Sequence, residues 1–151
     1  ATWVISKFGA TIEQMVALAV LMPIVASMGG NAGTQTMTVT VRALATRELT
    51  TSNAKRIIFR EFSIALLNGI IIAVLIGGLS WAWFNSSALG GVMAVAMIIN
   101  MIMAGLAGIL IPIGLDKINI DPALASSIFV TTITDVIGFF AFLGLAAVVL
   151  I

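Results

Sequence analysis

The stretch PALASSIFVTTITDVIGFFAFLGLAAVVLI (residues 122–151) indicates the fold of this chain more clearly than any other part of the sequence. It contains a single charged residue, Asp135, among apolar and small side chains. A helix needs about 20 mostly apolar residues to cross a lipid bilayer, and this stretch supplies them. It therefore predicts a membrane-spanning helix that carries a carboxyl group near the middle of the bilayer.

Three other stretches have the same apolar character, at residues 12–41, 62–84 and 89–113. The 151-residue chain is 61% hydrophobic and only 9% charged, whereas about a quarter of the residues of a soluble domain are charged. We therefore predict an all-α integral membrane protein in which residues 1–151 form one transmembrane domain, a bundle of four complete spans. Because the chain begins with Ala1, we interpret it as a fragment, with residues 1–11 as the end of a preceding helix or an outer loop.

The basic residues gather in the segment between the first two spans. Residues 42–61 contain five Lys and Arg side chains against Glu48 and Glu61, and the two later loops carry at most one. Because positively charged loops stay on the cytoplasmic side, we predict a multi-pass protein of the inner cell membrane with residues 42–61 in the cytoplasm and the C-terminus outside. Trp81 and Trp83 then fall at the outer interface, where aromatic side chains are enriched.

Two loops contain signals for the start of a helix. Residues 50–53 (Thr-Thr-Ser-Asn) offer N-caps before Ala54, which predicts a helix that runs along the membrane interface before it crosses the bilayer. Asp121 followed by Pro122 suits an N-cap with proline at the first helical position. The alternative interpretations of Asp121 are an exit-site carboxylate and a plain loop charge.

The residue types that are absent exclude several classes of protein. No Cys or His occurs, so thiolate and imidazole metal sites, cysteine nucleophiles and Ser-His-Asp triads are ruled out. No span offers an activated nucleophile or an acid–base pair. We therefore expect no enzyme activity, the lipid bilayer as the surroundings of the chain, and no nucleic acid as a partner.

Asp135 is the residue that says most about function. An isolated carboxylate at the centre of a bilayer costs at least about 2.5 kcal/mol, and no Lys or Arg lies at a comparable depth in any predicted span. A hydrated cation pathway is therefore its expected partner; the alternative is a protonated carboxyl group hydrogen-bonded to a neighbouring helix. Steps of three or four residues place further residues on the same helical stripe, namely Ser127, Thr131, Thr134 and Gly138. Thr132 lies off this stripe and is expected to hydrogen-bond to its own helix.

A second polar segment, SMGGNAGTQTMT (residues 27–38), interrupts the first span. Its glycines let helices approach closely, and its polar residues repeat every three or four positions along one face: Ser27, Asn31, Thr34, Gln35 and Thr38. Their oxygen atoms could contact a hydrated or a stripped ion, and polar packing between helices is the alternative. Asn68 and Asn100, in the next two spans, are expected to form interhelical hydrogen bonds rather than to bind an ion.

Every candidate ligand is an oxygen atom of a carboxylate, amide, hydroxyl or backbone carbonyl group. Such ligands suit hard cations such as Mg²⁺, Ca²⁺ and Mn²⁺. Because Mg²⁺ gives up its water reluctantly, a wide polar pore with one carboxylate per subunit suits it. Two positive charges gain about 4.6 kcal/mol on entering a cell at about −100 mV, so a passive channel is energetically sufficient.

Residues 23–35 (PIVASMGGNAGTQ) closely resemble the first signature of the MgtE family of magnesium channels, and residues 121–127 through 131–138 resemble its last helix. The resemblance implies a homodimer of five-helix subunits with the pore between them, lined by the family's second and fifth helices. Those helices correspond to the first and fourth predicted spans, and the family's pore carboxylate and pore asparagine match Asp135 and Asn31. The family's cytosolic magnesium-sensing domains and most of its first membrane helix have no counterpart in these residues.

The residues and the resemblance together lead us to expect a channel that carries Mg²⁺ inward, with Mn²⁺, Co²⁺ and Ca²⁺ as other candidate ions. Asp135 would hold the hydrated ion, and six further residues would shape the site through side chains or backbone carbonyls: Asn31, Gln35, Thr131, Thr134, Gly30 and Gly138. The alternative function is a cation-coupled secondary transporter that uses Asp135 as its coupling site. A third is a non-conducting subunit of a membrane assembly.

Overall fold

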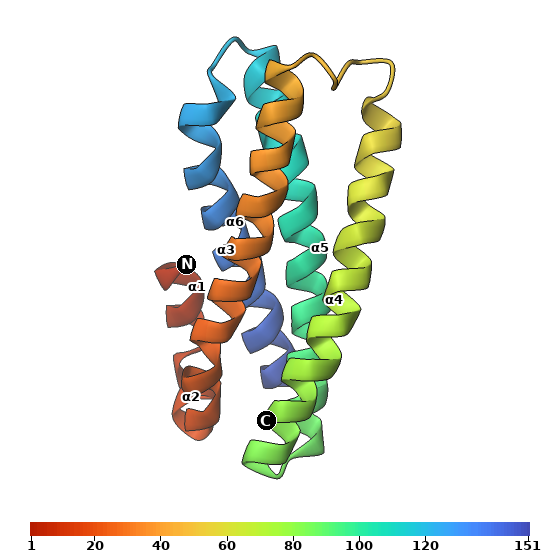
Figure 1. Ribbon diagram of the computed structural model, residues 1–151. Helices are drawn as coiled ribbons and strands as arrows, with labels where there is room; N and C mark the ends of the chain where they lie inside the picture. Colours follow the sequence, from red (N-terminus) through yellow and green to blue (C-terminus); the bar gives the residue numbers. More distant parts are fainter.

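The computed structural model describes residues 1–151 and consists of α-helices joined by short loops (Figure 1). Four of the helices are long: α3 (Val16–Ala45), α4 (Ala54–Phe84), α5 (Ser87–Lys117) and α6 (Pro122–Val149). Each of them is long and apolar enough to cross a membrane, and no strand is present. The predicted fold class, an all-α membrane bundle, is confirmed.

Helix α5 lies at the centre of the bundle and packs against α3, α4 and α6, whereas α3 and α4 barely touch each other. Glycines make the close packing around α5 possible, because they let two helix backbones approach. A Cβ atom at Gly90 of α5 would lie 2.7 Å from the carbonyl oxygen of Gly77 on α4. A Cβ atom at Gly108 of α5 would lie equally close, 2.7 Å, to the carbonyl oxygen of Gly33 on α3. Both contacts are therefore closer than any side chain at these α5 positions would allow.

The apolar core lies where α3, α5 and α6 meet, in the half of the bundle that holds the C-terminus. Its largest fully buried side chains are those of Leu18, Leu89, Met93, Met97, Phe142 and Leu143. By contrast, many large apolar side chains of α4 are exposed, among them Leu67, Val74 and Leu79. Exposed apolar side chains on a long apolar helix are what contact with lipid tails requires.

Helix α4 starts where the sequence predicts, but without the predicted side-chain cap. It begins at Ala54 and continues without a break to Phe84, so residues 54–61 and the predicted span at residues 62–84 belong to one helix; that residues 54–61 lie along the membrane interface stays a prediction. The side chain of Asn53 does not cap the helix. Its Oδ1 accepts from the backbone N–H of Thr50 at 2.8 Å, and its Nδ2 donates to the carbonyl of Glu48 at 2.8 Å. Asn53 therefore holds the preceding loop together.

Helix α6 starts as the sequence predicts. The carboxylate of Asp121 accepts a hydrogen bond from the backbone N–H of Ala123 at 2.9 Å, and Pro122 is the first helical residue. The N-cap hypothesis for Asp121 is thus confirmed. The helix then runs to Val149, within the predicted 122–151 span.

Residues 1–15 form two short helices, α1 (Thr2–Lys7) and α2 (Gly9–Gln14), and Met15 is extended before α3 begins. Helix α1 packs against α6, where the rings of Phe8 and Phe140 meet edge to face with centroids 6.1 Å apart. Val4 is buried in the same contact region. These two helices therefore cover the half of α6 that leads to the C-terminus (Figure 1).

Candidate functional site

Each of the four long helices carries one Asn or Asp close to its middle. Asn31 in α3, Asn68 in α4, Asn100 in α5 and Asp135 in α6 lie no more than two residues from the midpoints of their helices. Polar side chains at mid-membrane depth are costly and are usually functional or paired. The structure gives these four residues different surroundings, and the differences define the candidate site.

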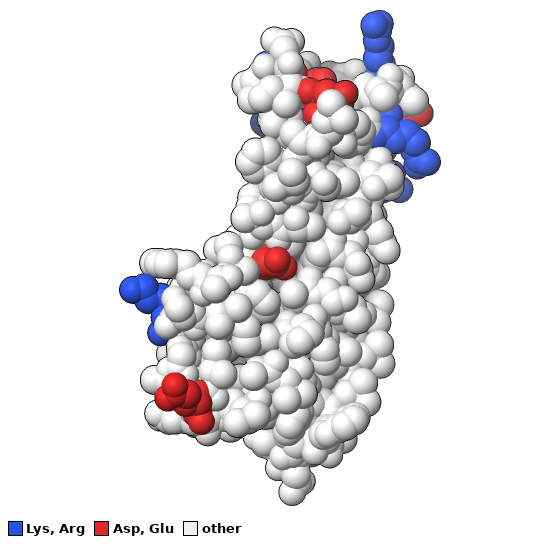
Figure 2. All heavy atoms as spheres, turned by 90° about the vertical axis from the view of Figure 1, so that its left-hand side faces the viewer, with Lys and Arg blue, Asp and Glu red and all other residues white.

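Asp135 is partly exposed on α6 and makes neither a hydrogen bond nor an ion pair within the chain. On the face shown in Figure 2, most charged side chains lie toward the two ends of the molecule; one acidic group lies by itself between them, and a basic group projects from the left edge at a similar height. Thr131 and Ser127, four and eight residues before Asp135, are exposed as well. Because a helix repeats about every 3.6 residues, these three residues form a polar stripe on the open side of α6.

The hydroxyl group of Thr131 is already used as a donor. It donates to the backbone carbonyls of Ser127, at 2.9 Å, and Ile128, at 3.2 Å. Thr132 bonds its own helix in the same way, at 2.7 Å from the carbonyl of Ile128, as the sequence predicts. A hydroxyl that donates to its own helix presents only lone pairs outward. The stripe around Asp135 is therefore rich in acceptors, which is the arrangement that the outward hydrogens of metal-bound water require.

Thr134 and Gly138 lie away from this stripe. The side chain of Thr134 is fully buried and donates to the carbonyl of Thr131 at 3.0 Å, and Gly138 is buried against Asn100 of α5. A helix turns about 100° per residue, so both positions point roughly 60–100° away from Asp135. In the single chain, Thr134 and Gly138 therefore lie apart from Asp135, although the spacing of three and four residues predicted one common stripe. Their part in an ion site stays a prediction.

On α3, Asn31 and Gln35 are exposed and Gly30 is half-buried. A Cβ atom at Gly30 would meet nothing within 4 Å, so the backbone is accessible there. Neither Asn31 nor Gln35 forms a hydrogen bond within the chain. Both line a cavity of about 300 Å³ between α3 and α4, together with Asn68.

The cavity continues toward the loop of residues 46–53 as a second hollow of about 280 Å³, to which Gln35 and Asn68 also belong. Glu61 lines this second hollow and is half-buried, without a basic partner within salt-bridge distance. The sequence alone places Glu61 in the basic segment of residues 42–61 and predicts that Asn68 forms a hydrogen bond to a neighbouring helix. Asn68 instead makes no hydrogen bond in the chain, and the two residues share one face of α4, seven positions apart. The spacing of two helical turns is the feature of the sequence that would have predicted that Glu61 and Asn68 lie on the same face.

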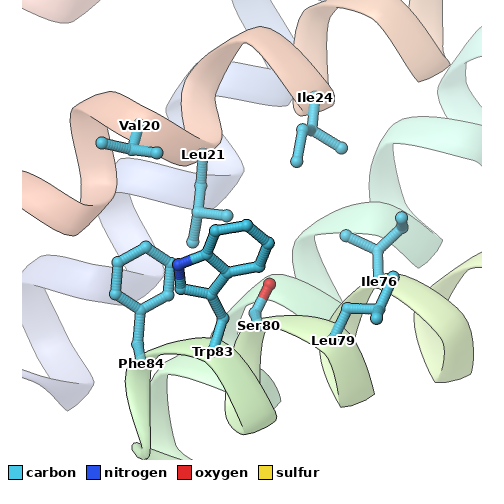
Figure 3. Close-up of a pocket in the computed structure, with 8 residues that line it drawn as sticks. All are labelled: Val20, Leu21, Ile24, Ile76, Leu79, Ser80, Trp83 and Phe84. Carbon is cyan, nitrogen blue, oxygen red and sulfur yellow. The ribbon is translucent and has the colours of Figure 1, made fainter.

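The opposite end of the α3–α4 groove is apolar (Figure 3). A cavity of about 290 Å³ lies there between side chains of both helices, with Leu21, Ser80 and Phe84 next to the Trp83 ring. The other lining residues are Val20, Ile24, Ile76 and Leu79. Ser80 is the single polar residue of this lining. The groove is therefore suited to lipid or another apolar surface at this end and to water or polar groups at the other.

Of the four mid-helix Asn and Asp residues, Asn100 alone is fully buried. Its Nδ2 donates to the backbone carbonyl of Val25 on α3 at 2.7 Å. The interhelical hydrogen bond expected from the sequence is therefore confirmed for Asn100. No group of three or more His, Cys, Asp or Glu side chains comes together anywhere in the chain.

The chain is similar to known divalent cation transporters. The sequence model of the MgtE family, described as a divalent cation transporter, matches residues 22–145. The chain is 38% identical over 143 residues to the magnesium transporter MgtE of Bacillus subtilis, covering 95% of the chain and 32% of that protein. It is 33% identical over 147 residues to the magnesium transporter MgtE of Thermus thermophilus, covering 97% of the chain and 32% of the relative. The chain therefore spans about a third of the length of the curated relatives that it matches.

Proposed function

The chain belongs to the MgtE family of divalent cation transporters, and from this membership we propose that it forms one subunit's share of a magnesium channel. In this proposal two copies of the chain face each other across a pore, and Mg²⁺ moves inward through the inner membrane. The observation that carries the proposal is Asp135, which lies at the middle of α6, open to one face and without a basic partner. Transport rather than catalysis is the proposed activity.

The charge of Asp135 supports a divalent cargo. A carboxylate at mid-depth needs a compensating charge or water, and no Lys or Arg occupies the middle of any of the four long helices. A pair of facing subunits would bring two carboxylates to the axis between them, which balance the charge of one Mg²⁺. Proteins seldom strip Mg²⁺ of all its water, so we propose that the ion passes this level hydrated.

The surface around Asp135 supports a hydrated ion in particular. Water bound to a metal points its hydrogens outward, so it is recognised by acceptors. Thr131 presents lone pairs beside Asp135, and the amide oxygens of Asn31 and Gln35 are free on α3. We assign the backbone at Gly30 to the same site because it is accessible. In the arrangement of the single chain we assign Thr134 and Gly138 to helix packing.

We propose that residues 42–61 lie in the cytoplasm and that the C-terminus lies outside. The basic residues of this segment support the orientation because positive loops stay inside. Mn²⁺ and Co²⁺ are proposed as further cargo, since they favour similar octahedral oxygen surroundings, and Ca²⁺ as a weaker one, because it prefers more ligands at longer distances.

The test is Mg²⁺ flux into liposomes that contain the full-length protein, with the membrane voltage as the only driving force. We expect Asp135→Asn to lower the rate at least about tenfold, because charge-assisted hydrogen bonds to the hydrated ion, each worth about 1.5–3 kcal/mol, are lost. Asp116→Asn, an exposed carboxylate at the end of α5, is the matched control and should retain the parental rate. Parental flux in Asp135→Asn would remove this residue from the proposed site. A strict requirement for a proton or Na⁺ gradient would instead favour a coupled transporter.

A further inference from the structure

Asn100 occupies a position in which one side chain meets two helices at once. Its amide is fully buried on α5, and Nδ2 donates to the carbonyl of Val25 on α3 at 2.7 Å. Two glycines make room for it. A Cβ atom at Gly138 of α6 would lie 2.8 Å from Nδ2, and one at Gly29 of α3 would overlap the same amide. The amide is therefore clamped between the backbones of α3 and α6.

The two clamped points are close to the proposed ion site on both helices. Gly29 comes two residues before Asn31, and Gly138 comes three residues after Asp135. Each contact thus lies within one helical turn of a residue assigned to the ion. No other polar side chain in the chain donates a hydrogen bond from one long helix to another.

We propose that Asn100 is a positioning residue that fixes the register of α3 against α6, and through it the spacing between Asn31 and Asp135. This inference rests on the proposed channel function. The hydrogen bond to the carbonyl of Val25 fixes where α5, which carries Asn100, lies along α3. The contact of the same amide with Gly138 then places α6 relative to both helices. Apolar contacts between helices in lipid provide little such preference, because lipid tails offer the same surroundings.

The other half of the amide supports a directional role rather than a stabilising one. Oδ1 of Asn100 is buried and has no hydrogen-bond partner. A buried acceptor without a partner is costly, and it offsets much of what the hydrogen bond to Val25 contributes. A leucine of similar size would avoid this cost but could not select the carbonyl of Val25. The asparagine therefore contributes a fixed position of the helices along one another rather than stability.

The experiment compares Asn100→Leu with Met97→Leu in the full-length protein. Met97 is fully buried in the apolar core three residues earlier on α5, so both substitutions place a leucine in the interior of the same helix, but only Asn100→Leu removes the hydrogen bond to Val25. The readout is the ratio of Mg²⁺ to Ca²⁺ flux in liposomes, which does not depend on how many molecules fold. We expect Asn100→Leu to change this ratio about threefold, the factor that corresponds to an average interhelical hydrogen bond in a membrane protein, and Met97→Leu to leave it unchanged.

A second measurement reads the register itself. Residues 1–151 contain no cysteine, so spin labels at Thr46→Cys and Leu124→Cys report the distance between the neighbouring ends of α3 and α6. The labelled protein is mixed with an excess of unlabelled protein to suppress signals between subunits. We expect one narrow distance distribution in the parent and in Met97→Leu, and a shifted or broadened one in Asn100→Leu. If Asn100→Leu does not insert, Gly138→Ala displaces the same amide and should shift or broaden the distribution equally.

The outcomes separate this inference from the proposed function. An unchanged distance distribution together with an unchanged flux ratio in Asn100→Leu overturns the positioning role and leaves the channel intact. A parent without any voltage-driven Mg²⁺ flux overturns the channel, and the distance measurement then still decides whether Asn100 fixes the register. Equal effects of Asn100→Leu and Met97→Leu would also overturn the inference, because the loss would then not depend on the hydrogen bond to Val25.

Discussion

Replacing Gly108 by alanine tests whether close backbone contact between α3 and α5 is required. The new methyl group would lie 2.7 Å from the carbonyl oxygen of Gly33, 2.8 Å from the Cβ atom of Thr36 and 3.0 Å from the backbone nitrogen of Met37. Ordinary contacts of a Cβ atom begin at 3.4 Å, so the helices must separate locally by about 0.7 Å (3.4 minus 2.7). Two of the three neighbours are backbone atoms, which cannot turn aside as a flexible side chain can.

The magnitude follows from two opposing effects. Overpacking of this kind costs about 1–3 kcal/mol, whereas alanine in place of glycine favours a helix by about 0.5–1 kcal/mol. Gly114→Ala is the matched control, because it lies on the same helix and its Cβ atom would meet nothing within 4 Å. The propensity gain is common to both variants, so the difference between them isolates the packing cost. We expect Gly108→Ala to be less stable than Gly114→Ala by about 1–3 kcal/mol.

The assay is reversible unfolding in mixed micelles of a mild detergent and dodecyl sulfate, followed by circular dichroism. Each variant gives a free energy of unfolding relative to the parent. If Gly108→Ala proves as stable as Gly114→Ala, the two helices do not touch as described, and α5 is not the centre of the bundle. The account also expects lower Mg²⁺ flux in Gly108→Ala, because the displaced part of α3 adjoins Gln35.

Three further predictions follow from packing, capping and orientation. Phe142→Ala should lower the free energy of unfolding by about 3–5 kcal/mol, because its ring is fully buried. Phe129→Ala, at a half-exposed position of the same helix, should cost much less in the same mixed-micelle assay. Equal costs would contradict the placement of Phe142 in the apolar core. Asp121→Ala should cost about 1 kcal/mol through loss of the N-cap of α6, and an unchanged midpoint would contradict that cap. In membrane vesicles, a thiol reagent that cannot cross the bilayer should label Ser52→Cys from the cytoplasmic side and Asn85→Cys from the outside; the reverse pattern would invert the proposed orientation.

The helices and the candidate residues Asp135, Asp121 and Asn100 could be picked out from sequence because their signals are local. Long apolar stretches predict membrane helices by length and composition alone, and a lone carboxylate such as Asp135 stands out without knowledge of its neighbours. The Asp121–Pro122 pair likewise marks the start of α6 by itself. Asn100 could be assigned to an interhelical hydrogen bond because a buried amide needs a partner, although its partner Val25, 75 positions earlier in the chain, could not be named.

Features that depend on which helices touch could not be inferred. Helical spacing placed Thr134 and Gly138 on one stripe with Asp135, but the width of the face that stays open depends on how α5 packs against α6. The groove between α3 and α4 exists because both helices pack against α5 instead of each other, and no local pattern reports that. Glu61 was therefore placed in a basic loop when it lines the polar end of this groove.

The most direct test of the central claim is a structure of the full-length protein in its membrane form, soaked with Mn²⁺ and located by anomalous scattering. The account predicts metal density about 4 Å from the carboxylate oxygens of Asp135, the separation that a metal–water distance of about 2.1 Å and a hydrogen bond of about 2.7 Å give when they meet at the water oxygen at a roughly tetrahedral angle. The same density should be absent from Asp135→Asn. Metal found only elsewhere, with the carboxyl group of Asp135 hydrogen-bonded to a neighbouring helix, would contradict it.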